Sequence, residues 1–277
     1  MRPKFNVVGD TFTYTHGGNK GYSVHGKAAD LMEWVQDGSA DDTFYIDTWG
    51  NEAFADGRSG KKYLWLLESR SVYPHLAEKI KMNVRRYVNT FDLIFTHDQE
   101  LLRLGPKFKF VPAQWSWIDE PNIREKTKLV SMISSSKNFF AGHSYRLKWV
   151  DRLKDDLDLY GRGFNEIDKK EKGLDDYMFS VAIENGVYRT YFTEKIIDCF
   201  LTGTVPVYYG TPDIGDHFNA DGIITLREDF CVDQLTPELY ESKKEAIEEN
   251  FQTALDIGVL EDYIYRNYLR GDSGTSL

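Results

Sequence analysis

Short apolar segments alternate with amphipathic ones along the whole chain. Most of the apolar runs are too short for helices and are followed either by a polar loop or by apolar residues at helical spacing. The strands expected from these runs cover residues 5–8, 44–46, 62–68, 92–96, 108–111, 129–134, 157–160, 177–184, 205–209 and 222–226. The helices expected cover residues 28–35, 76–87, 100–104, 145–153, 193–201, 237–255 and 261–269. Buried strands that alternate with helices favour parallel sheets.

A polar stretch at residues 117–128, which contains Pro121 and alternating charges, divides this pattern into two series. We therefore predict an α/β protein of two Rossmann-like lobes, residues 1–125 and 126–277, with an interlobe cleft that binds a ligand. The length of 277 residues suits two domains or one large domain.

Composition narrows the choice of partners. Hydrophobic residues make up 41% and charged residues 28% of the chain, which is typical of globular proteins. The net charge of −10 argues against nucleic acid and anionic membranes as partners. No run approaches the ~18 apolar residues of a membrane span. Two cysteines, Cys199 and Cys231, are too few for a disulfide framework, and no signal-peptide core follows Met1, so we expect a cytoplasmic protein.

The densest chemical signal follows an expected buried strand of the second half. Glu184 and Asn185 end that strand, and a loop leads to Thr193, the expected N-cap of the next helix. Glu194 and Lys195 then lie in the first helical turn, where free backbone N–H groups and the helix dipole favour an anion. A lysine is unfavourable there unless a phosphate is bound. A capped helix with a solvated Glu–Lys pair is equally compatible with these residues alone.

This segment resembles the signature of the α1,3/1,4-fucosyltransferases, glycosyltransferase family 10. The family pattern is Phe-Glu-Asn-Ser/Thr after an apolar strand, then Tyr-Val/Ile-Thr-Glu-Lys, a helix, and Val-Pro-Val/Ile-x-x-Gly. The chain has Ile183-Glu-Asn-Gly186, Tyr191-Phe-Thr-Glu-Lys195 and Val205-Pro-Val-Tyr-Tyr-Gly210, and departs from the pattern at Ile183, Gly186 and Thr190. Upstream, Arg146 at the start of an expected helix and the block Tyr160-Gly-Arg162 are similar to further family features.

The resemblance implies a GT-B-type fold, GDP-L-fucose as donor and a glycan hydroxyl as acceptor. It also implies roles for five residues in the second half. Arg146 and Lys195 would stabilise the departing diphosphate together with the helix amino end. Glu194 would bind hydroxyls of the donor, and Tyr191 would pack on its nucleotide or sugar. Asn185 would position the loop or touch the donor. Such a cradle requires neither a metal ion nor another cofactor.

The first half contributes one candidate catalytic residue. Glu68 ends the expected strand 62–68, and the family places its general base at an equivalent strand-end glutamate. The acceptor hydroxyl must lose its proton as it attacks the anomeric carbon, and a half-buried glutamate can have a pKa raised toward neutrality. This arrangement predicts a single displacement with inversion. The alternative is an ion pair between Glu68 and Arg70.

Three other interpretations stay open. Asp156 and Asp158 have the Asp-x-Asp spacing of metal-dependent glycosyltransferases, although a solvated charged face is the more common origin of such a run. A GT-B transferase that uses another nucleotide sugar would share the diphosphate cradle, and competition between GDP and UDP would separate the two. A non-catalytic nucleotide- or carbohydrate-binding protein would bind without turnover and would tolerate Glu68→Ala.

Overall fold

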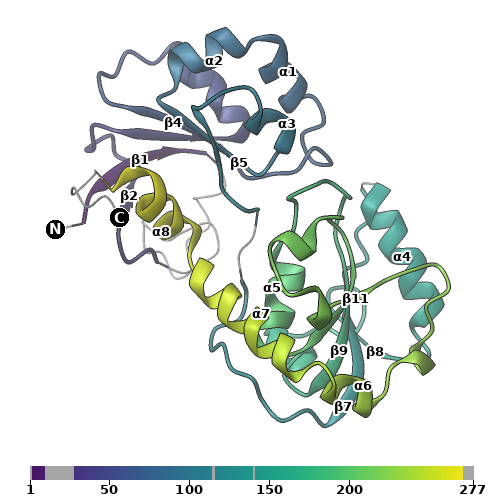
Figure 1. The fold of residues 1–277 in the computed structure, drawn as a ribbon. Helices are drawn as coiled ribbons and strands as arrows, with labels where there is room; N and C mark the ends of the chain where they lie inside the picture. The colour runs from purple at the N-terminus through teal and green to yellow at the C-terminus, as the bar shows by residue number, and fades with distance from the viewer. Residues whose placement is uncertain (1, 10–27, 114–115, 140, 271–277) are drawn as a thin grey trace. The chain divides into compact units, whose positions relative to one another are not determined.

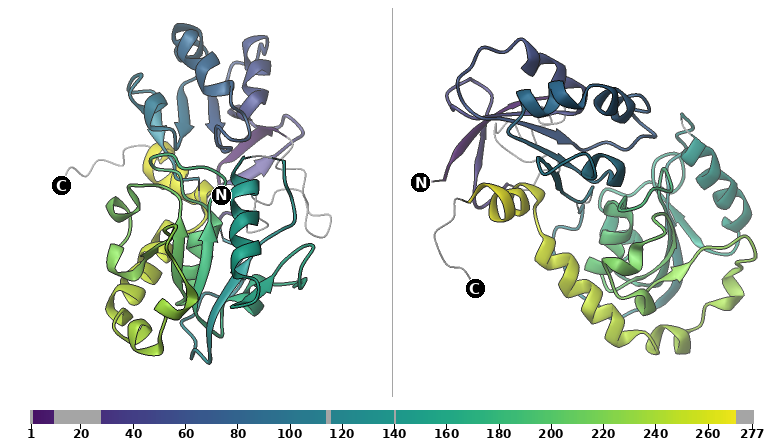
Figure 2. Two further views of the ribbon diagram at one scale, coloured as in Figure 1. Left: turned by 90° about the vertical axis from the view of Figure 1, so that its right-hand side faces the viewer. Right: turned by 45° about the horizontal axis from the view of Figure 1, so that its top comes forward.

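The computed structural model describes residues 2–9, 28–113, 116–139 and 141–270, and the chain divides into two compact units. Unit 1 comprises the described residues of Met1–Ala113 and Ile257–Leu277, and unit 2 those of Gln114–Asp256. Each unit contains its own sheet of parallel strands with helices beside it (Figures 1 and 2). The predicted α/β fold class of two Rossmann-like lobes is thereby confirmed.

The sheet of unit 1 has six parallel strands in the order β2-β1-β3-β4-β5-β6. Chain order reverses between β1 and β3, and ligands of open α/β sheets bind beyond the carboxyl ends of the strands at such a switch point. The strands are β1 (Lys4–Val8), β2 (Glu33–Val35), β3 (Thr43–Ile46), β4 (Lys62–Leu66), β5 (Leu93–Thr96) and β6 (Phe108–Phe110).

Side chains that alternate along these strands build two cores, one on each face of the sheet. Phe44 and Tyr63 belong to one core with Leu260 of α8 (Leu260–Ile264). Tyr45 and Leu64 belong to the other core, which contains residues of three helices. These are α1 (Leu76–Met82), α2 (Val84–Thr90) and α3 (Gln99–Leu102). A 3₁₀ helix at Asp47–Phe54 follows β3 directly.

The sheet of unit 2 repeats the strand order of unit 1 over five strands, β11-β10-β9-β7-β8, with the reversal between β7 and β9. All four pairings are parallel. The strands are β7 (Lys128–Ile133), β8 (Asp158–Tyr160), β9 (Tyr177–Ile183), β10 (Val205–Tyr209) and β11 (Ile224–Thr225). By the same rule, the carboxyl ends of β7 and β9 are the expected ligand position of this unit.

Four helices accompany this sheet. Residues of α4 (Ala141–Leu153), α6 (Pro237–Glu241) and α7 (Lys244–Ile257) share one apolar core with the strands. Seven of the eight residues of α5 (Glu194–Leu201) are buried, including two acids. Buried carboxylates need partners, so this helix already marks a polar site. No helix among the described residues combines the length and the apolar character needed to cross a bilayer.

Several expected helices differ in the structure. Residues 28–35 were expected to be helical, but they contain the edge strand β2, which pairs with β1 and buries Trp34 against Phe44. Tertiary packing overrides the local helical spacing there. The expected helix 76–87 breaks into α1 and α2 at Asn83, whose φ of −126° is not helical. The expected helix 237–255 divides into α6 and α7.

The domain boundary also differs from the expected one. It lies between Ala113 and Gln114 instead of between residues 125 and 126, and the carboxyl-terminal segment belongs to unit 1. The reason is visible in its contacts, because the Asp262 carboxylate accepts hydrogen bonds from the N–H groups of Asp30 (2.9 Å) and Leu31 (2.8 Å). Leu260 and Ile264 are buried in the core of unit 1. Contacts between chain ends leave no local signal in the sequence.

Candidate functional site

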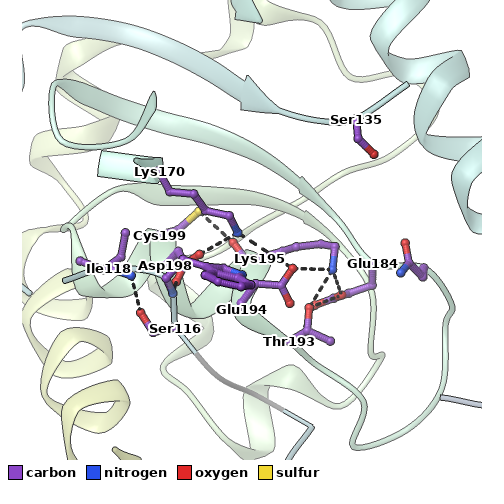
Figure 3. Close-up of polar contacts among 12 residues, drawn as sticks. Ser116, Ile118, Ser135, Lys170, Glu184, Thr193, Glu194, Lys195, Asp198 and Cys199 are labelled. Atoms are coloured by element: carbon purple, nitrogen blue, oxygen red, sulfur yellow. Dashed lines mark hydrogen bonds and ion pairs between the residues drawn. The ribbon is translucent and has the colours of Figure 1, made fainter. Parts of the chain in front are cut away.

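In unit 2, Glu184 joins the end of β9 to the start of α5 (Figure 3). The residue is 1% exposed. It accepts hydrogen bonds from the backbone N–H of Thr193 (2.8 Å) and from the Thr193 hydroxyl (2.7 Å). Thr193 occupies the N-cap position as expected, but its side chain does not cap the helix. The protein's own carboxylate therefore lies at the helix end where the sequence suggested a phosphate.

Lys195 is paired with carboxylates. Its ammonium lies 3.1 Å from Oε1 of Glu194 and 3.4 Å from Oε2 of Glu184. Burial lowers the pKa of Lys195, but these two carboxylates outweigh burial and raise the pKa above its usual value. The two carboxylates thus account for a lysine in this turn. The expectation that it is unfavourable there unless a phosphate is bound was wrong. Its side chain is 20% exposed, so Lys195 is only partly covered by these neighbours.

A second lysine extends this network. The Lys170 ammonium lies 2.8 Å from Oδ2 of Asp198 and 3.9 Å from Oε1 of Glu194 (Figure 3). Burial raises the pKa of Glu194, yet Lys195 and Lys170 together lower it to about 2. Asp198 also accepts a hydrogen bond from the N–H of Trp117 at 2.9 Å. Sequence reasoning missed Lys170 and Asp198, although Asp198 lies one helical turn after Glu194 and could have been found from that spacing.

Arg146 and Asn185 contact each other directly. Nη1 of Arg146 donates to Oδ1 of Asn185 at 3.1 Å, and Nη2 lies 3.5 Å from Oγ of Ser135. Arg146 is 6% exposed and comes from the second turn of α4. The first turn of α4 lies against the end of β9, since a Cβ at Gly142 would overlap the carbonyl of Asn185. Two residues predicted from separate motifs are therefore held together by main-chain packing.

Two buried polar atoms of this site have no hydrogen-bond partner among the described residues. They are Nε of Arg146, a donor, and Oε2 of Glu194, an acceptor. Burial lowers the pKa of Arg146, and the charges of Glu194 and Glu184 oppose that effect, so all three groups act on one another electrostatically. Unsatisfied buried polar groups are rare and costly. A ligand that carries both an anionic oxygen and a hydroxyl could satisfy both atoms.

The loop between Asn185 and α5 is fixed by a strained turn. Thr190 has a φ of +64°, which is uncommon for a β-branched residue, and its N–H donates to Oδ1 of Asp213 at 2.8 Å. Tyr191 follows it and is 4% exposed, with its ring centroid 6.0 Å from that of Tyr188. The contact predicted between Tyr191 and a nucleotide or sugar stays a prediction.

The structure explains why the motif ends in a glycine, Gly210. A Cβ at this position would overlap the hydroxyl of Tyr208 and would lie 2.7 Å from Cγ of Glu184. The Tyr208 hydroxyl is also 3.5 Å from Oε1 of Glu184. The motif at the end of β10 therefore leaves room for the buried carboxylate at the end of β9.

Unit 1 holds the predicted base. Glu68 lies two residues beyond β4 and is exposed, instead of half-buried as expected. Its backbone N–H and that of Leu67 both donate to Oδ1 of Asp47, at 3.2 and 2.9 Å. Arg70, which the alternative interpretation paired with Glu68, forms ion pairs with Asp98 (2.6 Å) and Glu100 (2.9 Å). The side chain of Glu68 is thus accessible while its main chain is held.

The Asp-x-Asp candidate has a local partner. Asp158 accepts a hydrogen bond from the Tyr177 hydroxyl at 2.5 Å. Across residues 2–9, 28–113, 116–139 and 141–270, no group of three or more His, Cys, Asp or Glu side chains is arranged to hold a metal ion.

Comparisons with known proteins concern mainly unit 2. Residues 123–248 match the model of "Glycosyltransferase family 10 (fucosyltransferase) C-term". The chain is 33% identical to an α-(1,3)-fucosyltransferase of Helicobacter pylori over 66 residues, which are 24% of this chain and 14% of that enzyme. The chain thus spans about a seventh of the length of this curated relative.

Two crystal structures of an α1,3-fucosyltransferase, the second with GDP, align with 92% of this chain and with 80% and 81% of theirs. Their TM-scores are 0.51 and 0.50 at 16% and 15% identity, which supports the two-lobed GT-B-type fold. The family resemblance predicted from residues 183–210 is confirmed, because residues 123–248, which contain that segment, match the family model.

Proposed function

We propose that this chain is an inverting fucosyltransferase that transfers L-fucose from GDP-fucose to a hydroxyl of a glycan acceptor. One observation carries the proposal: a buried donor, Nε of Arg146, and a buried acceptor, Oε2 of Glu194, lack partners in the segment that matches family 10. A nucleotide sugar offers phosphate oxygens to the first and sugar hydroxyls to the second. The crystal structure of an α1,3-fucosyltransferase with GDP supports a guanine nucleotide.

On the donor side, Arg146 and Lys195 stabilise the diphosphate as it leaves. The bond between the anomeric carbon and the phosphate oxygen breaks, and negative charge accumulates on that oxygen. Preorganised cations lower the free energy of such a transition state. The ion pairs of Lys195 with Glu184 and Glu194 hold its ammonium before the donor binds, so little reorganisation is needed. Glu194 accepts a hydrogen bond from the sugar, and Asn185 orients Arg146.

On the acceptor side, Glu68 takes the proton of the attacking hydroxyl. The new bond forms between the acceptor oxygen and the anomeric carbon, on the face opposite the leaving phosphate. The proton moves to the Glu68 carboxylate as the glycosidic bond forms. An exposed carboxylate on a fixed main chain is suited to this exchange, because the acceptor can reach it.

The same proposal excludes a metal requirement, because Arg146 and Lys195 supply the positive charge opposite the diphosphate. Transfer is expected to continue in excess EDTA at the rate seen without chelator. A complete loss of activity in EDTA, restored by Mg²⁺ or Mn²⁺, would instead indicate that a metal ion bound by Asp156 and Asp158 neutralises the diphosphate.

The direct experiment combines binding and turnover. Calorimetry with GDP and UDP is expected to give clearly tighter binding of GDP, and incubation with GDP-fucose and a panel of oligosaccharide acceptors is expected to yield fucosylated product and free GDP. Preference for UDP would identify another nucleotide-sugar transferase. Tight GDP binding without product on any acceptor, and without slow hydrolysis of GDP-fucose, would favour a binding protein.

A further inference from the structure

Asp47 is a buried carboxylate that the proposed reaction does not use. It is 5% exposed and lies directly after β3, at the switch point of the unit 1 sheet. Its φ of +47° is in the left-handed region, which non-glycine residues seldom occupy without a local reason. Burial raises the pKa of Asp47 to about 7. A strained, buried acid at the edge of a sheet is costly, so its contacts indicate what it does.

Asp47 accepts hydrogen bonds from the main chain at Leu67 and Glu68. A single oxygen, Oδ1 of Asp47, accepts the N–H of Leu67 at 2.9 Å and the N–H of Glu68 at 3.2 Å. The chain has left β4 at this point, so the sheet no longer supplies partners for these N–H groups. The strands β3 and β4 are paired in register, with Ile46 opposite Trp65. Asp47 therefore continues the hydrogen bonding of the two strands by one further step.

The main chain is also held on its other sides. His97, which follows β5 and is 5% exposed, lies against the main chain of Glu68 and Leu67. After Glu68, the carbonyl of Ser69 accepts the N–H groups of Val72 and Tyr73, both at 3.0 Å. Buried groups thus fix the backbone at residues 67–69, whereas the Glu68 side chain is exposed.

We propose that Asp47 is a positioning residue, whose carboxylate holds the Leu67–Glu68 main chain so that the Glu68 carboxylate meets the acceptor hydroxyl in one orientation. This inference rests on the proposed function of Glu68 as the general base. Asp47 touches neither donor nor acceptor and acts through Glu68 alone. General-base catalysis depends steeply on the distance and angle of proton transfer, so loss of this support lowers turnover and leaves donor binding in unit 2 intact.

The test uses two variants that both tolerate a positive φ. Asp47→Asn keeps an Oδ1 acceptor for both N–H groups, whereas Asp47→Gly removes the acceptor. At the pH of maximal activity, we expect Asp47→Gly to lower kcat at least about tenfold without changing the KM for GDP-fucose or the affinity for GDP. We expect Asp47→Asn to stay within about threefold of the wild-type kcat. If Asp47→Gly does not fold, Asp47→Ser, whose side chain is shorter, should lower kcat in the same way.

A combined variant separates positioning from a general loss of stability. In a Glu68→Gln background, Asp47→Gly should cause no further loss of turnover, because the base it positions is already absent. A further tenfold loss there would overturn the inference, and so would a wild-type kcat in Asp47→Gly when Glu68→Gln is impaired. Wild-type turnover in Glu68→Gln would instead reject Glu68 as base, and the inference would fall with the proposed function.

Discussion

The two units share a strand order but hold their charged groups in opposite ways. In each sheet an acidic residue directly follows the strand that borders the reversal of strand order, Asp47 after β3 in unit 1 and Glu184 after β9 in unit 2. In unit 2, Glu184 and Glu194 are buried and share ion pairs with Lys195. In unit 1, Glu68 is exposed, and a buried acid contacts its backbone.

This difference matches two kinds of chemistry. A buried network of fixed charges can stabilise a leaving diphosphate without reorganising, which is the requirement on the donor side. A base must exchange a proton with a second substrate, so its carboxylate has to be accessible while its position stays defined. The comparison therefore predicts that substitutions in unit 1 change turnover, whereas substitutions in unit 2 change donor binding and stability together.

The largest effect is expected from Glu68→Gln. The amide cannot accept the proton of the acceptor hydroxyl, so kcat should fall at least about a hundredfold, and the affinity for GDP should stay at the wild-type value. Steady-state transfer assays and calorimetry measure the two quantities. Glu52→Gln is the matched control, because Glu52 is another exposed glutamate of unit 1. Unchanged turnover in Glu68→Gln would remove the distinction between the two units.

Lys195→Met should weaken GDP binding about tenfold to a hundredfold and should also lower the free energy of unfolding by a few kcal/mol. The reason for the second effect is that Glu184 and Glu194 stay buried after their shared cation is lost. Calorimetry and urea unfolding measure the two effects. Lys172→Met, which removes an exposed lysine paired with Asp168, should change neither.

The double variant Lys195→Met with Glu184→Gln sharpens this test. Glutamine at position 184 removes one of the uncompensated charges, so part of the lost stability should return. The affinity for GDP should not return, because the phosphate partner is still missing. Recovery of both would show that Lys195 is needed only for folding.

The third effect is expected from Arg146→Lys. Lysine keeps the positive charge but loses Nε and the forked donors that reach Asn185 and Ser135. GDP binding should weaken about tenfold, and kcat at saturating GDP-fucose should fall by a smaller factor, because lysine still offers a positive charge to the leaving diphosphate. Arg152→Lys on the same helix is the control, because Arg152 donates to the carbonyls of Glu228 and Phe230 instead. Equal affinities in the two variants would argue against a phosphate contact for Arg146.

The sequence predicted unit 2 better than unit 1, and the reason is physical. The residues Glu184, Asn185, Glu194 and Lys195 lie within one strand–loop–helix segment, so their spacing along the chain already brings them together. Arg146 was found through a family motif, but Lys170 comes from a 3₁₀ segment, Lys170–Gly173, with no signal of its own.

In unit 1, the relevant contacts connect different strands. Asp47, Glu68 and His97 follow β3, β4 and β5, and only the pairing of those strands brings them to one edge of the sheet. The sequence identified the strand-end Glu68 but gave no reason to expect Asp47 in a left-handed conformation beneath it. The edge strand β2 and the return of α8 to unit 1 were missed for the same reason, since both depend on contacts distant in sequence.

The smallest effect is expected in the pH dependence of wild-type stability, because two buried groups of unit 1 change the free energy of unfolding in opposite directions as the pH rises. Burial raises the pKa of Asp47 from 3.8 to about 7, so the folded state holds its proton and loses stability as the pH rises through that range. Burial lowers the pKa of His97 from 6.5 to about 4, so the folded state gains stability as the pH rises from 4 to 6.5. The two slopes should largely cancel between pH 4 and 6.5.

Single variants should reveal each slope. Relative to wild type, Asp47→Asn should gain stability from pH 4 to 7, by up to about 4 kcal/mol for a shift of three pKa units. His97→Asn should lose stability relative to wild type from pH 4 to 6.5, because the rising contribution of the histidine is removed. Urea unfolding at half-unit pH steps measures both curves. Parallel curves for Asp47→Asn and wild type would mean that Asp47 is not desolvated in the folded protein, and the contrast between a buried positioning acid and an exposed base would fail with it.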